Sequence, residues 1–302
     1  MRVVMTGATA GIGLVAARRL LAAGERLAVG ARSPDAAPAD LKRSAAFHHL
    51  DLGDLRAVQS FVDDVQSGPE IDVLILNAGV QNVTGGRSAQ GLEITFATNH
   101  LAHFLLLRRL LSRMAPNGRI ILTSSGTHDP EEKTGLPPPR HAEARRLAYP
   151  ETDPDRDPSA AVAGRRAYST SKLCNVMTAR ELATRTAGTR PDLSIMAFDP
   201  GFTPGTGLAR DYPGIASFLF RHFLPLVVRG ERVSTPANSG RLLAEMVTEP
   251  AYAASRGGYF AVRGKSLLEV DPSVLARDDN SCARLWDDSE ALLNEVAPGA
   301  LP

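Results

Sequence analysis

The sequence predicts an α/β fold: a doubly wound parallel sheet with helices on both faces, in a single domain spanning residues 1–302. Strand-like and helix-like segments alternate from the first residues onward, which favours parallel strands joined by right-handed helical crossovers. A glycine-rich segment directly follows the first strand-like run. The chain is also long enough, at 302 residues with 43% hydrophobic side chains, to bury a full core.

The first half of the chain alternates strands and helices in regular order. Apolar residues at helical spacing, among them Leu14, Leu20 and Leu21, predict a helix over Ile12–Ala23. A second helix is expected over Leu55–Val65. Short apolar runs predict the strands that flank them, at Arg2–Thr6, Leu27–Gly30, Phe47–Leu50 and Val73–Leu76.

The second half continues the pattern with longer helices. Core-facing spacing predicts a helix over Thr98–Met114, with Leu101, Phe104, Leu105 and Leu111 on its inner side. After it we expect, in order, the strand Arg119–Thr123, the helix Tyr168–Ala187 and the strand Leu193–Phe198. A short strand near Tyr259–Val262 closes the sheet, and a last helix over Ser281–Val296 ends before Pro298.

Two segments depart from this alternation. Residues 126–165 hold seven prolines and many charges, and they are far longer than the usual connection of about 4–6 residues. A tolerated surface insertion is one interpretation, but its position between two chemical motifs favours a loop that shapes a substrate pocket. Residues 205–228 are expected to form a lid over the same pocket, and an apolar, fairly bulky substrate is expected because this segment contains Phe218, Leu219, Phe220, Phe223 and Leu224.

Composition excludes several classes of protein. The 34 basic and 33 acidic residues give a net charge of +1, which leaves no strong field to attract nucleic acid or an anionic membrane. Two cysteines exclude a disulfide framework and favour a reducing compartment, so a cytoplasmic location is expected. No signal peptide is recognisable, and no apolar run reaches the ~18 residues that span a bilayer, so no integral membrane association is expected.

The segment after the first strand has the features of a phosphate-binding turn. It reads Thr6-Gly7-Ala8-Thr9-Ala10-Gly11-Ile12-Gly13 and runs into a predicted helix. The glycines allow the backbone to approach a ligand closely, and free N–H groups at the helix start can bind a pyrophosphate. This strand–turn–helix context predicts a dinucleotide site, with cofactor contacts at Gly7, Thr9, Gly11, Ile12 and Gly13.

The end of the second strand indicates which dinucleotide binds. An NAD site usually carries an acidic residue there to hold the ribose 2′-hydroxyl. This chain has Arg32 and Ser33 instead, and a guanidinium beside a hydroxyl suits a 2′-phosphate. We therefore expect NADP(H) rather than NAD(H), the alternative being that Arg32 is a solvated surface residue.

Two further strand ends are expected to contact the cofactor. Asp51 and Leu52 follow the third strand, where a carboxylate beside an apolar side chain suits an adenine edge; Asp51 capping the next helix is the alternative. Asn77-Ala78-Gly79 ends the fourth strand. Asn77 is expected to tie neighbouring strands together, and the small Ala78 and Gly79 let the cofactor lie near the backbone.

The acid–base chemistry is expected on the helix that follows the insertion. Tyr168 and Lys172 are four residues apart, so they project from one helix face. A nearby ammonium favours the phenolate, and Tyr168 can then exchange a proton with a carbonyl or alcohol oxygen. Ser125, after the fifth strand, is placed to hold the substrate oxygen, and Asn99 to support proton return. A core tyrosine, a surface lysine and a helix N-cap at Asn99 are the alternatives.

Taken together, these motifs resemble those of the short-chain dehydrogenase/reductase family, in order along essentially the whole chain. The resemblance implies Asn99, Ser125, Tyr168 and Lys172 as catalytic residues, with Tyr168 and Lys172 also contacting the nicotinamide ribose. It further implies a nicotinamide carboxamide loop at Pro200 and Gly201, with Thr203 as a phosphate or amide contact. The expected fold is then of the Rossmann type.

Finer features are similar to one branch of that family, the retinol dehydrogenases and protochlorophyllide reductases. They are the runs Thr98–Phe104, Ser171–Asn175 and Ala283–Ser289. Protochlorophyllide reductases carry a cysteine after the Pro-Gly loop, where this chain has Phe202, and the start of the insertion near His128 also differs. We therefore predict no light-driven reaction, and we expect Cys174 to be a small core residue.

The expected function is an NADP(H)-dependent oxidoreductase that moves a hydride between nicotinamide and a carbonyl or alcohol carbon of a largely apolar small molecule. Two alternatives stay open: a C=C double-bond reductase of the protochlorophyllide reductase type, and a non-catalytic NADP(H)-binding regulator. No metal is expected at the site. The long helix over Thr98–Met114 offers a surface for a possible homodimer.

Overall fold

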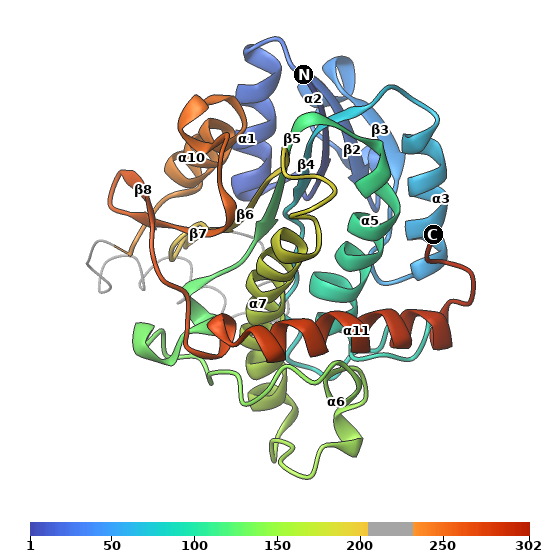
Figure 1. Ribbon diagram of the computed structural model, residues 1–302, viewed down its shortest axis with the longest axis vertical. Coiled ribbons are helices and arrows are strands. Elements are labelled where there is room, and N and C mark those ends of the chain that lie inside the picture. The colour runs from blue at the N-terminus through green and yellow to red at the C-terminus, as the bar shows by residue number, and fades with distance from the viewer. Residues whose placement is uncertain (205–231) are drawn as a thin grey trace.

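The computed structural model describes residues 1–204 and 232–302, and within them the strands join into one sheet. The strands are β1 (Arg2–Thr6), β2 (Arg26–Ala31), β3 (Ala46–His49), β4 (Ile71–Leu76), β5 (Met114–Thr123), β6 (Ser194–Asp199), β7 (Arg256–Arg263) and β8 (Ser266–Glu269). Their order is β3-β2-β1-β4-β5-β6-β7-β8, and Figure 1 shows β3 and β8 on opposite sides of the molecule. Every neighbouring pair is parallel except β7 and β8. The doubly wound Rossmann-type sheet is therefore confirmed, with an antiparallel edge strand that the sequence did not predict.

The register of the sheet brings the carboxyl ends of the central strands to one edge. Thr6 of β1 pairs with Gly30 of β2, and Thr123 of β5 pairs with Phe198 of β6. The strand order reverses between β1 and β4, which lie side by side at the centre of the sheet. In open α/β sheets a ligand binds beyond the carboxyl ends of the strands at such a point.

Helices cover both faces of the sheet (Figure 1). On one face lie α1 (Gly11–Ala22) and α10 (Pro236–Thr248), packed against each other. On the other lie α3 (Leu55–Gln66), α5 (Ala102–Leu110) and α7 (Ala160–Arg185), while α11 (Asp279–Val296) crosses the outer side of α7. Each face has its own apolar cluster, so the sheet is buried on both sides, as the consecutive apolar residues Val3, Val4 and Met5 of β1 require.

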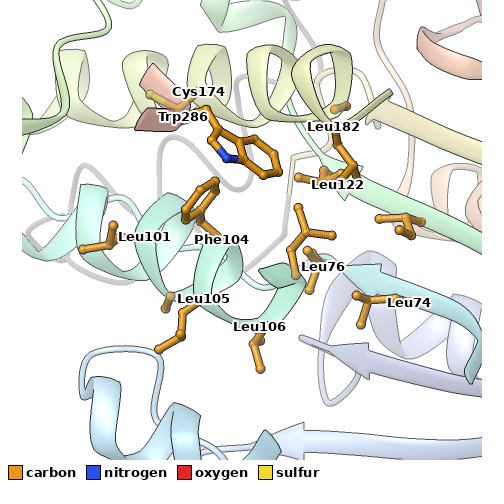
Figure 2. Packing of buried hydrophobic residues seen from close by; sticks show 14 of the residues in the cluster. Leu74, Leu76, Leu101, Phe104, Leu105, Leu106, Leu122, Cys174, Leu182 and Trp286 are labelled. Atoms are coloured by element: carbon orange, nitrogen blue, oxygen red, sulfur yellow. The ribbon is translucent and has the colours of Figure 1, made fainter. Parts of the chain in front are cut away.

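The C-terminal helix contributes to the same core as the first half of the chain. Figure 2 shows Trp286 of α11 against Phe104 of α5, above Leu76 of β4. The rings of Phe104 and Trp286 meet edge to face with their centroids 4.8 Å apart, and both side chains are buried. Because residues from both ends of the chain share one core, the described residues form a single domain, as predicted.

Several element boundaries differ from the sequence-based expectation. Met114 begins β5 instead of ending a helix, because it pairs with Ile71 across the sheet. The helical segment before it begins earlier, with α4 (Ile94–Phe96) and a π-helical turn over Ala97–Leu101. Helix α7 begins at Ala160, inside the predicted insertion, and α2 (Ala39–Ser44) and α10 were not predicted.

Ion pairs hold the proline-rich segment 126–165 in place. It contains short 3-10 turns and one small helix, α6 (Ala144–Ala148). Asp157 pairs with Arg166 at 2.8 Å, and Glu132 pairs with Arg232 at 2.6 Å and with Arg263 at 2.8 Å. The segment is thereby tied to α7 and β7. The expected lid at 205–228 lies outside the described residues.

Candidate active site

The turn after β1 leaves no space for a side chain at Gly7 or at Gly13. Gly7 has a φ of +72°, and a Cβ on it would lie 2.7 Å from the Asn77 amide nitrogen. A Cβ on Gly13 would overlap the carbonyl oxygen of Gly7. Thr9, Gly11 and Ile12 lie half-buried around the same turn. Ala10 is the N-cap of α1 and supplies no side-chain hydrogen bond, so the first N–H groups of this helix are available to an anion.

The residues expected at the adenosine end lie just after the neighbouring strands β2 and β3. Arg32 and Ser33 are exposed directly after β2, and Arg32 has no hydrogen bond or ion pair with any described residue. Asp51 accepts a hydrogen bond from the Gly53 N–H at 2.9 Å, and Leu52 is buried. The N-cap of α3 is Asp54, so Asp51 is not the helix cap considered as its alternative role.

Asn77 joins three strands at the carboxyl edge. Its amide nitrogen donates to the carbonyl oxygens of Thr6 at 3.3 Å and Gly7 at 3.1 Å, and its oxygen accepts from the Thr123 hydroxyl at 3.3 Å. The next two residues are small and leave room beside the backbone. A Cβ on Gly79 would lie 3.3 Å from the Lys172 ammonium nitrogen, so the end of β4 borders the predicted acid–base residues.

Tyr168, Lys172 and Ser125 converge at the end of β5. The Ser125 hydroxyl lies close enough to the Tyr168 phenol to lower its pKa. The Lys172 Nζ lies 5.6 Å from the centroid of the Tyr168 ring and donates to the Thr123 carbonyl oxygen at 3.1 Å. Both side chains of α7 are buried, with 7% of Tyr168 and 3% of Lys172 exposed. A surface lysine is therefore excluded.

The electrostatics of these groups set their protonation states. Burial and the negative charge of Asp199 raise the pKa of Tyr168 above its ordinary value, while the nearby Ser125 hydroxyl opposes this. The sequence predicts that Lys172 lowers this pKa, whereas the lowering influence in the structure comes from Ser125. Burial lowers the pKa of Lys172 to about 8, although Asp199 favours the ammonium. At neutral pH the phenol is therefore protonated and the ammonium charged.

Asn99 lies inside the π-helical turn and is completely buried, so it is not a helix N-cap. The cap of this helical segment is Glu93. The Asn99 side chain exchanges two hydrogen bonds of 2.8 Å with the backbone of Val80, and its amide nitrogen lies 3.0 Å from the Ser171 hydroxyl. Asn99 therefore links the segment just after β4 to α7, where its partner Ser171 directly precedes Lys172.

The predicted carboxamide loop follows β6. Gly201 has a φ of +70°, and the Ser239 hydroxyl donates to the Pro200 carbonyl oxygen at 2.7 Å. Thr203 is buried nearby in sequence. Sequence reasoning missed Asp199, a buried carboxylate at the end of β6 that accepts from the Gly201 N–H at 2.9 Å and the Tyr259 hydroxyl at 3.1 Å. Its position at a strand end, before Pro-Gly, is the signal that identifies it.

Other reactive side chains are structural. Cys174 and Cys282 are buried free thiols, and burial raises the pKa of Cys282 to about 11 and that of Cys174 still further.

Within 1–204 and 232–302, no helix has the length and apolar character needed to cross a bilayer. The same residues contain no group of three or more His, Cys, Asp or Glu that could hold a metal ion.

Comparison with known proteins agrees with this geometry. A family model described as short chain dehydrogenase matches residues 1–133. The chain is 31% identical to protochlorophyllide reductase A from Oryza sativa, over 97% of this chain and 81% of the rice protein. It is 32% identical to protochlorophyllide reductase from Pisum sativum, over 96% of this chain and 77% of the pea protein.

Solved structures agree on the fold. An uncharacterised protein from Mycobacterium paratuberculosis superimposes with a TM-score of 0.67 at 28% identity, covering 96% of this chain and 92% of that one. A short chain dehydrogenase from Burkholderia cenocepacia, solved with NADP, has a TM-score of 0.60 at 20% identity, covering 87% and 96%. With sequence motifs, sheet order and relatives in agreement, this chain belongs to the short-chain dehydrogenase/reductase family.

Proposed function

We propose that the protein is an NADP(H)-dependent oxidoreductase that transfers a hydride between nicotinamide and a carbonyl or alcohol carbon of a largely apolar small molecule. One observation carries the proposal. A buried, neutral phenol at Tyr168 lies near the Ser125 hydroxyl and beside the buried ammonium of Lys172. A proton donor held this way is suited to an oxygen that gains charge as hydride arrives.

The residues around the turn after β1 fit a dinucleotide. The glycine positions leave a backbone cradle that side chains would fill, and α1 begins without a side-chain cap. Asn77, Ala78 and Gly79 border the path from this turn to Lys172. When bound, the nicotinamide supplies or accepts the hydride. Pro200, Gly201 and Thr203 would hold its carboxamide end.

Arg32 and Ser33 support NADP(H) in preference to NAD(H). They stand where the ribose 2′-position of a dinucleotide is expected, after β2. The Arg32 guanidinium is exposed and has no ion-pair partner among the described residues, so it is available to a phosphate. No carboxylate replaces it at this strand end. Asp51 and Leu52 are the proposed neighbours of the adenine.

Each acid–base residue has a separate task in this proposal. The Ser125 hydroxyl orients the substrate oxygen, and Tyr168 gives that oxygen its proton, because the raised pKa keeps the phenol protonated at neutral pH. Lys172 would hold the ribose, and the Ser125 hydroxyl stabilises the phenolate that remains. Asn99 fixes Val80 beside this pair and supports proton return. The protonated state of Tyr168 favours the reduction direction.

A second candidate is reduction of a C=C bond. The curated relatives named above are protochlorophyllide reductases, and the similarity extends over nearly the whole chain. Against it stands Phe202, at the position where the resemblance implies a cysteine, and Phe202 forms a backbone bridge with Val233. A non-catalytic regulator has less support, because this chain keeps the complete acid–base set.

The test is an NADPH oxidation assay against aldehydes, ketones and conjugated alkenes. Wild-type protein is expected to reduce carbonyl compounds, with apolar ones preferred. Tyr168→Phe should lower kcat by about 10²–10⁴-fold, because it removes the proton donor, while the Kd for NADPH stays within about threefold. Tyr252→Phe is the matched control, since this partly buried tyrosine packs on Phe260 in the apolar cluster on the sheet face opposite α7.

Three outcomes separate the alternatives. Consumption of NADPH only with conjugated alkenes would favour double-bond reduction. Tight NADPH binding without turnover on any substrate would favour a regulator. Retention of most carbonyl reduction by Tyr168→Phe would refute the assignment of the proton donor.

A further inference from the structure

The run Thr98–Phe104 contains a histidine that the proposed function does not use. His103 lies on α5, one helical turn after Asn99, and only 1% of it is exposed. Its Nδ1 is 3.1 Å from the backbone oxygen of Asn99, and its Nε2 is 3.0 Å from the Thr6 hydroxyl. Burial lowers its pKa to about 4, so the ring is neutral at pH 7. A neutral imidazole has one donor and one acceptor, and both are engaged here.

The partners of Thr6 determine which nitrogen carries the proton. The Thr6 Oγ1 lies 3.0 Å from each of the N–H groups of Asn77 and Ala78, which only donate. With both its lone pairs used, the hydroxyl must donate its own proton to Nε2 of His103. Nδ1 faces a carbonyl oxygen, which only accepts, so it must carry the ring proton. The hydrogen bonds are satisfied by one tautomer, the Nδ1–H form.

This imidazole joins the two halves of the site. On one side Thr6 binds the end of β4 and directly precedes the glycine turn, whose Gly7 oxygen is held by Asn77. On the other side Asn99 clamps Val80 and contacts Ser171, the neighbour of Lys172. His103 is the direct side-chain link between Thr6 and the π-helical turn.

We infer that His103 is a positioning residue: its Nε2 fixes the Thr6 end of the cofactor turn, and its Nδ1–H fixes Asn99 beside the acid–base pair. The inference rests on the proposed function, because the two ends are assigned to cofactor binding and proton return there. It predicts that the two hydrogen bonds of one ring serve different steps. Breaking them separately should therefore give different kinetic defects.

Two substitutions of His103 each break one of its two hydrogen bonds and keep the other. The amide of His103→Asn overlays the Cγ–Nδ1 edge of the ring, so it keeps the donor to Asn99 and loses the bond to Thr6. The longer His103→Gln places its amide oxygen near the Nε2 position, where it accepts from Thr6 but leaves the Asn99 oxygen without its donor. Both variants leave buried polar groups unpaired, on the new amide and on the partner that loses its bond, so similar losses in thermal stability are expected.

The measurements are the Kd for NADPH by fluorescence titration and kcat with the best carbonyl substrate at saturating NADPH. His103→Asn is expected to raise the Kd about tenfold and to change kcat by less than about threefold. For His103→Gln we expect the reverse, a kcat lowered about tenfold with a Kd changed by less than about threefold. Parallel changes of Kd and kcat in both variants, in step with their melting temperatures, would reduce His103 to a packing residue and overturn the inference.

A second measurement is independent of turnover. Nitrogen-15 NMR of histidine-labelled protein reports which ring nitrogen carries the proton. The resonances of His103, assigned by their loss in His103→Asn, should be those of the Nδ1–H tautomer. An Nε2–H ring would contradict the inference even if the protein reduces carbonyl compounds. The wild-type protein could show no turnover while the NADPH affinities and the tautomer follow the expected pattern. In that case the proposed reaction and the role of His103 in kcat are both refuted, and the anchoring of the cofactor turn by His103 stands.

Discussion

Two buried neutral histidines make the stability of this protein depend on pH. Burial lowers the pKa of His100 to about 3 and that of His103 to about 4, below the ordinary value of 6.5. The unfolded chain therefore takes up protons before the folded chain does as the pH falls. The stabilisation is present above about pH 6.5 and is lost as the pH falls toward 4 and 3.

The loss of stability at pH 5.0 depends only on the ordinary histidine pKa of 6.5, because the pKa values of His100 and His103 in the folded protein both lie below 5. Each pKa unit corresponds to about 1.4 kcal/mol, so each histidine lowers the free energy of unfolding by about 2 kcal/mol between pH 7.5 and pH 5.0. His128, whose pKa burial also lowers, adds to this loss. Glu93 acts in the opposite direction, because burial raises its pKa. The contribution of one histidine to the pH dependence is therefore best measured as the difference between the wild-type protein and a variant that lacks this histidine.

Urea denaturation at pH 7.5 and pH 5.0 measures the effect in wild-type protein and in His103→Asn. The wild-type protein should lose more stability on acidification, and the difference between the two proteins should be about 2 kcal/mol. Asp153 and Asp192, whose pKa values are about 2, stay ionised in this range and do not contribute. An equal pH dependence in both proteins would refute the claim that His103 is buried and neutral.

Two other predictions concern the cofactor site. Gly13→Ala should lower the free energy of unfolding by about 1–3 kcal/mol and weaken NADPH binding, because its Cβ overlaps the carbonyl oxygen of Gly7. Calorimetry should show no loss of stability for the control Gly188→Ala, whose Cβ meets no atom within 4 Å. Equal melting temperatures for the two variants would show that the turn can relax. Arg32→Ala should lower kcat/KM with NADPH about 10–100-fold and change kcat/KM with NADH little. Equal losses with both cofactors would remove Arg32 from the 2′-phosphate site.

The features that were predictable from the sequence depend on neighbouring residues. The glycine turn is a strand, a tight turn and a helix within one short segment, so its residue types identify it. Tyr168 and Lys172 share a face because a helix repeats every 3.6 residues. The alternation of strands and helices predicted the sheet because connections are right-handed and short. The predicted boundaries of the helices and strands were less accurate. Met114, for example, belongs to β5 and not to a helix, because its pairing with Ile71 outweighs the helical spacing of the apolar residues before it.

Contacts between distant segments were decided by the tertiary structure. His103 meets Thr6 across 97 positions of the chain, and Tyr259 meets Asp199 across 60. Asn99 clamps Val80 in a π-helical turn, which its sequence neighbours do not distinguish from an ordinary helix. The sequence determined the order of the elements and the local motifs, because short-range geometry fixes them. The hydrogen-bond partners of the buried polar groups depended on the packing of strands and helices, because only that packing removes water and brings the partners from distant segments together.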